Sequence, residues 1–402
     1  MIHTLDNGLK VAVRQEPGNV TYAGIVIGAG TRDEPADHPG LAHFVEHTIF
    51  KGTAKRSACH ISNRMEAIGG EINAYTTKEI TSVYTIAPRG YDERAVELIA
   101  DLIDNPTFPE AEIDKEREVI VEEINSYLDN PAETVFDRFE NLFYKGSTLA
   151  NNILGTPESV RAITGRDCLD FVKSRYAPQR MAAFISTPLE PEKALKIARK
   201  HWGPLTGPSG ELRREPTPAL ETFDITEDHG GHQAHTIVGA RMFPRTDSRR
   251  FALMLLNNYL GGPCMNSRLN RELREKRGLV YAVDSFGSLL SDTGALMIYF
   301  GTDPKTVGKC LRIIRNELNR LAENKLTPRA LDKIKEQYCG QLLVSSDNKE
   351  SMAMSMGKNL LFYDRLTDIG ALAARLREVE AEEIRQVAEL LAPNLCSRLT
   401  LR

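Results

Sequence analysis

A stretch rich in glycine and proline divides the chain into two similar halves, and this apparent duplication limits the fold more than any other feature. The stretch covers residues 203–218 (GPLTGPSGELRREPTP) and indicates an exposed linker near the middle of the 402 residues. Since a domain typically holds about 150 residues, more than one domain is expected. We predict a first domain over residues 1–208, a linker over 209–221 and a second, homologous domain over 222–402.

The same order of patterns recurs in both halves. Each half has an extended segment, a helix, a long helix, a helix with an aromatic pair, and a closing helix, proline turn and strand. The paired segments are 72–86 and 280–300, 92–103 and 304–321, 112–116 and 329–334, 142–144 and 361–363, and 176–185 and 391–401. Several matches in one order favour internal duplication over a chance likeness between helix-rich domains.

The extended segments predict antiparallel sheet. Residues 72–76 and 81–86 are rich in Thr, Tyr, Val and Ile, and the four residues between them complete a hairpin pattern. We therefore predict an α+β fold of two homologous domains, each an antiparallel-rich sheet with a layer of helices.

Charge and composition exclude several classes of protein. The chain has 51 Lys and Arg against 55 Asp and Glu, whereas nucleic-acid-binding proteins usually carry a basic excess. No apolar run approaches the roughly 18 to 20 residues of a membrane span, and the first residues lack the pattern of a signal peptide. The six cysteines form no CxxC pair, which is typical of reduced thiols in the cytosol. We expect a cytoplasmic protein that binds neither nucleic acid nor membrane.

The segment HFVEH, residues 43–47, carries the clearest chemical signal. Residues 37–40 form a helix-start pattern, and Gly52 is a plausible stop. On a helix, His43 and His47 lie one turn apart on one face, where both imidazoles can meet one Zn²⁺, and Glu46 comes up beside that face. This is the inverzincin signature. The alternative is a pair of surface histidines on a solvated helix.

A catalytic zinc needs a third protein ligand, and residues 110–129 predict a strong helix that offers carboxylates. Glu116 and Glu123 share one face because they lie seven residues apart, so that one carboxylate could ligate with the other within reach of the ligands. Glu122, about 100° away around the helix, is the competing ligand. A charged, solvated face is the alternative for all three.

Together these features resemble the pitrilysin family of zinc metallopeptidases, which includes insulysin and the mitochondrial processing peptidase. In that family, HxxEH is followed at a similar distance by a ligating glutamate; here Glu123 follows His47 by 76 residues, in the context VIVEEI. The resemblance implies that Glu123 rather than Glu122 is the third ligand. It implies Glu46 and Glu116 as catalytic residues, and one Zn²⁺ per chain held by His43, His47 and Glu123.

Further motifs extend the resemblance over nearly the whole chain. Residues 69–76 (GGEINAYT) resemble the family's edge strand that holds the substrate backbone, which implies Asn73 and Ala74 as substrate-binding residues. Arg274 and Tyr281, seven residues apart, match the family's pair that contacts a carbonyl of the bound peptide.

The second half has lost the metal-binding side chains. At an offset of 218 residues, Glu116 and Glu123 fall on Ile334 and Gln341. When Gly52 is aligned with Gly261, the three residues of HxxEH fall on Ala252, Leu255 and Leu256. A second metal site at the histidines 229, 232 and 235 is disfavoured against a strand that begins in an exposed loop.

The resemblance implies a zinc-dependent endopeptidase that hydrolyses unfolded peptides inside a dimeric chamber. Zinc would activate a water molecule, and Glu46 would act as the general base. The peptide would add as a strand beside residues 72–76. Arg274 and Tyr281 would hold its carbonyl groups and steady the developing oxyanion.

Assembly follows from the same resemblance. Larger family members carry four such domains and close like a clamshell, so a chain with two domains should need a second chain. A homodimer is favoured, in which Arg274 and Tyr281 of one subunit complete the metal site of the other. The alternatives are a processing peptidase paired with a metal-free paralogue, and a catalytically idle structural or chaperone-like subunit. The lack of a transit-peptide pattern favours a bacterial protein.

Overall fold

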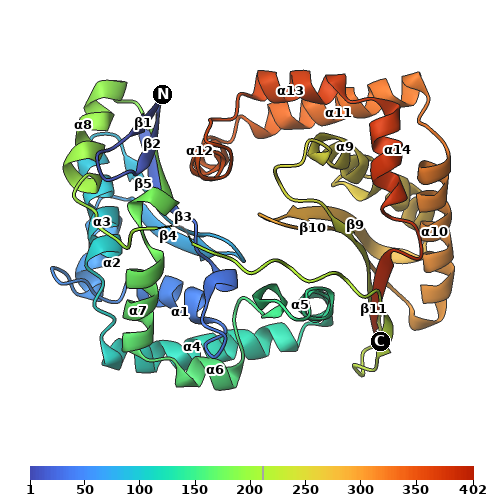
Figure 1. The fold of residues 1–402 in the computed structure, drawn as a ribbon, viewed down its shortest axis with the longest axis horizontal. Helices are drawn as coiled ribbons and strands as arrows, with labels where there is room; N and C mark the ends of the chain where they lie inside the picture. The colour runs from blue at the N-terminus through green and yellow to red at the C-terminus, as the bar shows by residue number, and fades with distance from the viewer. Residues whose placement is uncertain (211) are drawn as a thin grey trace. The chain divides into compact units, whose positions relative to one another are not determined.

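The computed structural model describes residues 1–210 and 212–402, which form two compact units (Figure 1). Residue 211, inside the expected linker 209–221, lies outside the described residues. Unit 1 consists of Met1–Asn125, Asn151–Glu215 and Ser346–Thr367, and unit 2 of Ser126–Ala150, Pro216–Ser345 and Asp368–Arg402. Each unit contains a sheet and a set of helices, so the predicted α+β class is confirmed.

Unit 1 is built on a six-stranded sheet. Its strands are β1 (Ile2–Thr4), β2 (Lys10–Gln15), β3 (Val20–Ile27), β4 (Glu71–Thr76), β5 (Thr81–Pro88) and β6 (Met181–Thr187). They lie in the order β1-β2-β6-β3-β5-β4. β2 and β6 run parallel, and the other pairs run antiparallel. The predicted hairpin is β4 and β5, and β4 forms one edge of the sheet.

Helices cover both faces of this sheet. The helices of unit 1 are α1 (Leu41–Thr48), α2 (Ala58–Glu66), α3 (Asp92–Asp104), α4 (Glu110–Leu128, whose end enters unit 2), α6 (Pro157–Ala162), α7 (Gly165–Arg175), α8 (Pro191–Trp202) and α12 (Lys349–Tyr363). β6 is buried at every position because alternate side chains enter different clusters. Ala183 and Ile185 join the cluster that includes α1, α3 and α8, whereas Ala182 and Phe184 pack with α12.

Unit 2 repeats this topology with five strands. They are β7 (Asp224–Glu227), β8 (Ala234–Met242), β9 (Val280–Leu289), β10 (Gly294–Thr302) and β11 (Cys396–Leu401), in the order β7-β11-β8-β10-β9. Taken in chain order, they occupy the positions of β2 to β6 in unit 1. The one parallel pair, β7 with β11, also corresponds to β2 with β6. This agreement supports internal duplication.

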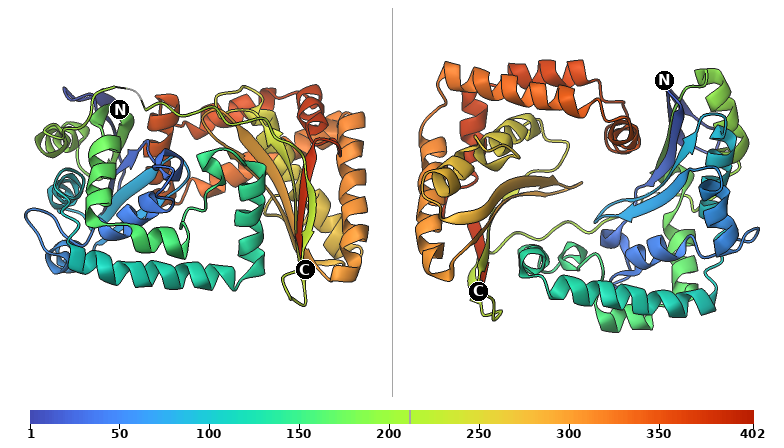
Figure 2. Two further views of the ribbon diagram at one scale, coloured as in Figure 1. Left: turned by 60° about the horizontal axis from the view of Figure 1, so that its bottom comes forward. Right: turned by 180° about the vertical axis from the view of Figure 1, so that it is seen from behind.

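Unit 2 also carries a set of α-helices. They are α5 (Pro131–Phe143), α9 (Arg250–Gly261), α10 (Val307–Glu323), α11 (Pro328–Ser345), α13 (Ile369–Glu378) and α14 (Ala381–Glu389). α9 and α11 occupy the chain positions of α1 and α4, as the sequence alignment of the halves predicts. Figure 2 shows the two sheets with their helices from two further sides.

Two helices pack in the unit of the opposite half. α5 comes from the first half but packs on β8 and β11, and α12 comes from the second half but packs on β3 and β6. Glycines permit both contacts: a Cβ at Gly239 would lie 2.7 Å from Phe139, and one at Gly357 would lie 2.6 Å from Val26. A single boundary at the linker does not predict this exchange.

Buried charges hold the linker against unit 1. Arg214 donates two hydrogen bonds of 2.8 Å, one to each carboxylate oxygen of Asp33. Arg32 pairs with Glu79, in the turn between β4 and β5, at 2.7 Å. Because Asp33 shortly precedes α1 and Glu79 follows β4, this network braces the segments beside the candidate site.

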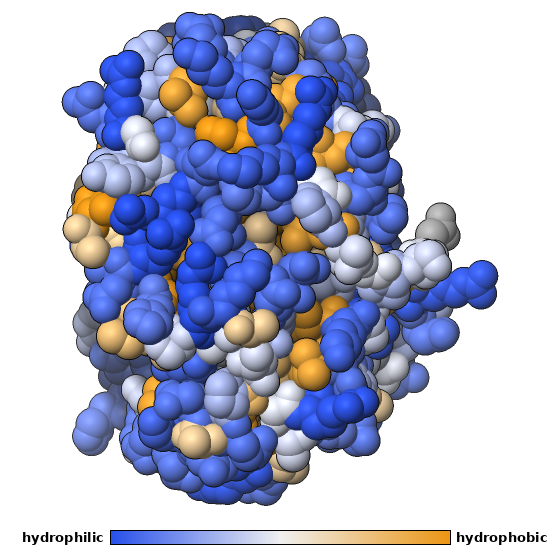
Figure 3. Space-filling model, turned by 90° about the vertical axis from the view of Figure 1, so that its left-hand side faces the viewer, coloured by the Kyte–Doolittle hydropathy of each residue, from blue (hydrophilic) through white to orange (hydrophobic). Residues whose placement is uncertain are grey.

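The surface is largely polar on the face shown in Figure 3, where apolar residues are scattered among hydrophilic ones. In the described part of the chain, no helix combines the length and the apolar composition that a membrane span requires. All six cysteines are free thiols.

Candidate metal centre

Helix α1 presents the HxxEH residues, and its start is fixed by a buried glutamate side chain. Glu34 accepts backbone hydrogen bonds from Gly40 at 3.0 Å and from Ala42 at 2.7 Å, so it satisfies N–H groups that a helix start leaves unpaired. Gly40 has φ +91°, and a Cβ there would lie 2.7 Å from the Leu154 carbonyl oxygen. The sequence predicted the helix start at residues 37–40, but it did not reveal the role of Glu34.

His43, His47 and Glu123 converge in unit 1. One ligand atom from each lies within 4.8 Å of the others. The Glu123 Oε2 atom is 3.6 Å from His47 Nε2 and 3.9 Å from His43 Nε2. Among the described residues, this is the only cluster of three or more His, Cys, Asp or Glu side chains close enough to share a metal ion. The competing Glu122 is exposed and lies outside it.

Glu46 lies at the edge of this cluster. Its Oε2 atom is 4.0 Å from His43 Nε2, and its side chain is mostly buried. Burial raises the pKa of the Glu46 carboxyl group, and the nearby Glu123 carboxylate adds to this effect. A carboxyl group with a raised pKa is better matched to proton transfer near neutral pH than an ordinary glutamate.

Glu116 contacts the His47 ring nitrogen that faces away from Glu123, and Lys51 in turn contacts Glu116. The Nδ1 atom of His47 lies 3.1 Å from Glu116 Oε1, which leaves Nε2 directed toward Glu123. The other Glu116 oxygen lies 2.8 Å from Lys51 Nζ. Burial favours a higher pKa for Glu116, but the hydrogen bonds from His47 and Lys51 outweigh it and lower the pKa. Sequence reasoning identified Glu116 and missed Lys51.

The donor set fits zinc. Burial lowers the pKa of His43 to about 3, so this imidazole is neutral, as a metal ligand must be. Ligands bound at about 2.0 to 2.2 Å around a tetrahedral zinc lie roughly 3.3 to 3.5 Å apart. The separations of 3.6 and 3.9 Å exceed this by a few tenths of an ångström. Two imidazoles and one carboxylate are a ligand set of catalytic zinc, which leaves a position open.

The edge strand β4 borders the helix that presents these residues. Thr76, at the end of β4, donates a hydrogen bond of 3.5 Å to the Ala42 carbonyl oxygen in α1. Asn73 and Ala74 lie on β4 and pair with β5 on one side. Because β4 ends the sheet, the opposite backbone edge has no partner strand within the described residues of unit 1. It is therefore a template for an added strand.

Arg274 and Tyr281 belong to unit 2. Arg274 lies in the π-helix Asn270–Glu275, a form often found at functional sites. Tyr281 lies on β9 and is 69% exposed. The Arg274 side chain is exposed as well. Both side chains can therefore be reached by a partner molecule.

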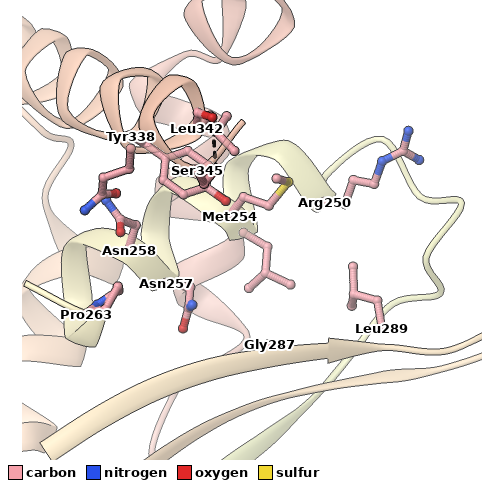
Figure 4. Close-up of a pocket in the computed structure, with 12 residues that line it drawn as sticks. Arg250, Met254, Asn257, Asn258, Pro263, Gly287, Leu289, Tyr338, Leu342 and Ser345 are labelled. Atoms are coloured by element: carbon pink, nitrogen blue, oxygen red, sulfur yellow. Dashed lines mark hydrogen bonds between the residues drawn. The ribbon is translucent and has the colours of Figure 1, made fainter. Parts of the chain in front are cut away.

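In unit 2, the counterpart of the metal face is apolar. Ala252, Leu255 and Leu256 of α9 are buried in the core. A cavity of about 430 Å³ lies among α9, α11 and β9, with Met254, Leu289 and Leu342 in its lining (Figure 4). Gln341, which aligns with Glu123, also lines it and donates to the Cys264 thiol at 2.8 Å.

The three histidines at positions 229, 232 and 235 lie on a strand and in the segment that precedes it. His235 lies on β8 and contacts the Tyr299 hydroxyl at 2.9 Å, whereas His229 and His232 are exposed in the preceding segment. The predicted strand after an exposed loop is confirmed.

Two family models match the chain. The model described as "Insulinase (Peptidase family M16)" matches residues 10–157, and the one described as "Peptidase M16 inactive domain" matches residues 162–338. The first match includes every candidate metal ligand. The second covers much of the half in which those ligands are replaced.

Curated relatives match nearly the full chain. An uncharacterized zinc protease of Bacillus subtilis, YmxG, is 31% identical over 97% of this chain and 95% of its own length. The mitochondrial-processing peptidase subunit beta of Bos taurus is 31% identical over 95% of this chain and 80% of that protein. A crystal structure of a protease from Helicobacter pylori gives a TM-score of 0.91, covers 100% of this chain and 99% of that one, and shows the shared fold at 22% identity.

Proposed function

Since the chain belongs to the insulinase family of peptidases, family M16, we propose that it is a zinc-dependent endopeptidase acting on unfolded peptides. The observation that carries the proposal is the convergence of His43, His47 and Glu123 beside Glu46. Relatives that are named zinc proteases and that match nearly the whole chain support it.

In this proposal, His43, His47 and Glu123 hold one Zn²⁺ per chain. When bound, zinc supplies a Lewis acid that polarises a carbonyl group and lowers the pKa of a water molecule. Glu46 accepts the proton of the attacking water and later delivers it to the leaving amine. Glu116 keeps the His47 ring in one orientation, as hydrogen-bonded partners of ligand histidines generally do.

The substrate is an extended peptide that adds to the free edge of β4. Backbone hydrogen bonds near Asn73 and Ala74 would supply affinity with little demand on sequence. Such pairing requires an extended chain, because a folded protein already pairs its own backbone groups. The position of β4 beside α1 supports this binding mode.

We assign the catalytic function to residues 1–208 and substrate binding by Arg274 and Tyr281 to residues 222–402, joined by the linker. The apolar residues at the aligned positions of the second half support this division. A bacterial, cytoplasmic location completes the proposal, supported by the bacterial relatives.

The test combines metal analysis with peptide hydrolysis. The purified protein should contain one zinc per chain and cleave an internally quenched, unstructured peptide. A chelator should abolish cleavage, and stoichiometric zinc should restore it. A protein that binds zinc but cleaves no unstructured peptide would instead support the idle or chaperone-like alternative.

The proposed assembly is a homodimer in which Arg274 and Tyr281 of a second copy complete each metal site. The exposure of both side chains supports it, and a two-fold dimer would then have two equivalent sites. Mixing an inactive Glu46→Gln chain with an inactive Arg274→Ala/Tyr281→Phe chain should restore activity, since each mixed dimer would contain one intact site.

The mixed-dimer experiment separates the assemblies. Recovery should reach about half of the wild-type activity per mixed dimer, because one of two sites is intact. No recovery, despite subunit exchange shown by differently tagged chains, would mean that each site is completed within one chain. Failure of the pure protein to cleave peptide until a metal-free paralogue is added would favour the heterodimer.

A further inference from the structure

Lys51 contacts the candidate metal centre without lying in the HxxEH motif. Its Nζ atom is 2.8 Å from Glu116 Oε2, and the other Glu116 oxygen faces His47 Nδ1 at 3.1 Å. The Glu116 side chain is only 10% exposed, and each of its two carboxylate oxygens contacts one protein side chain. The three side chains form a continuous chain of polar contacts that ends at a candidate ligand.

The segment that carries Lys51 is held firmly between α1 and α4. The Lys51 backbone N–H donates to the Thr48 carbonyl oxygen at 3.0 Å, and Gly52 accepts from the Thr107 N–H at 3.1 Å. A Cβ at Gly52 would lie 2.9 Å from Thr107 Oγ1 and 3.1 Å from Pro109. This close approach brings the segment to the start of α4, the helix that carries Glu116.

The charge of Lys51 also stabilises the Glu116 carboxylate. Glu46, Glu116 and Glu123 bring three negative charges to the site, and one Zn²⁺ would offset two of them. The ammonium group of Lys51 would offset the third. Without it, an unbalanced carboxylate would lie partly buried beside His47, which is costly in a protein interior.

We propose that Lys51 is a positioning residue for the metal centre: it fixes the Glu116 carboxylate so that this carboxylate orients His47 for zinc. The inference rests on the proposed function, because it assumes that His47 is a zinc ligand. It adds a residue whose effect on the metal passes entirely through Glu116.

The test measures zinc affinity by competition with a chelating indicator, using the zinc-free full-length protein. Lys51→Met should weaken zinc binding by about tenfold, the lower end of the range for losing a direct partner of a ligand, because Lys51 acts one contact further from the metal. Lys51→Arg should recover most of the affinity, because arginine keeps the charge and the donors. Lys55→Met is the matched control, since Lys55 lies in the same segment, is 62% exposed and pairs with Asp101 instead.

A double-mutant cycle tests the route through Glu116. In a Glu116→Gln background, Lys51→Met should cause little further loss of zinc affinity. An unchanged affinity in Lys51→Met, or an equal loss in both backgrounds, would overturn the proposal. Thermal melting of the zinc-free variants checks their folding, and Lys51→Gln replaces any methionine variant that does not fold.

The same zinc-affinity assay shows whether a failure concerns the role of Lys51 or the ligand set of the proposed function. If Glu123→Gln abolishes zinc binding while Lys51→Met binds as tightly as wild type, only the role of Lys51 is wrong. If Glu123→Gln keeps full zinc affinity, the ligand set of the proposed function is itself wrong.

Discussion

Replacing Glu46 by Gln is expected to leave zinc bound and to remove nearly all peptide hydrolysis. Glutamine has the same shape, so the convergence of His43, His47 and Glu123 should persist. Its amide cannot accept the proton of the attacking water at neutral pH. Since general base catalysis typically contributes 10²–10⁴-fold, kcat should fall by at least about a hundredfold.

The measurement is zinc content by elemental analysis together with turnover of the quenched peptide. Glu122→Gln serves as the control, because Glu122 is exposed and lies outside the cluster. Peptide binding, followed by the fluorescence of an uncleaved labelled peptide, should persist in Glu46→Gln. Near-normal turnover by the zinc-loaded variant would remove Glu46 from its assigned role.

Local sequence patterns predicted the elements of the site well. The helix expected over residues 110–129 is α4, and the expected hairpin is β4 with β5. Heptad spacing placed Glu116 and Glu123 on one face, and the buried Ile120 between them shows that this face is turned inward. Helical periodicity contains this information because side chains seven residues apart lie nearly in line.

Long-range contacts could not be predicted in the same way. Glu34 caps α1, and Lys51 contacts Glu116, which lies 65 residues later in the chain. Neither contact produces a periodic pattern in the sequence. The exchange of α5 and α12 between the units is also invisible locally, because each helix has an ordinary pattern. An exchanged helix differs from an ordinary one only in the sheet on which its apolar face packs, and the sequence of the helix does not specify that sheet.

Because the fold is duplicated, the candidate metal site of unit 1 can be compared with the aligned positions of unit 2. Two units share one strand order, yet one presents imidazoles and carboxylates where the other presents buried apolar side chains and Gln341. Unit 2 forms the same type of sheet, and its helices α9 and α11 take the chain positions of α1 and α4. The fold alone therefore does not require the charged side chains that α1 and α4 carry. The partly buried polar cluster of unit 1 carries a cost in stability that its apolar counterpart avoids, which favours a functional reason for it.

Replacing Glu123 by Gln should remove zinc from the protein, whereas replacing Glu122 should not. The amide has no negative charge and is a poorer zinc ligand than a carboxylate, which leaves His43 and His47 as the only two strong ligands. Glu122 and Glu123 are neighbours on α4, so the pair of variants changes the same charge on the same helix. Only the direction of the side chain differs.

Melting temperature gives a readout that needs no activity. A ligand at 100 times its Kd stabilises the folded state by about 2.7 kcal/mol, so added zinc should raise the melting temperature of wild type and of Glu122→Gln. Glu123→Gln should show little or no shift and should hold no zinc after dialysis. Zinc loss in Glu122→Gln with full zinc in Glu123→Gln would reverse the ligand assignment. The structure argues against that outcome, because Glu123 Oε2 lies within 4 Å of the Nε2 atoms of both histidines, at 3.9 and 3.6 Å.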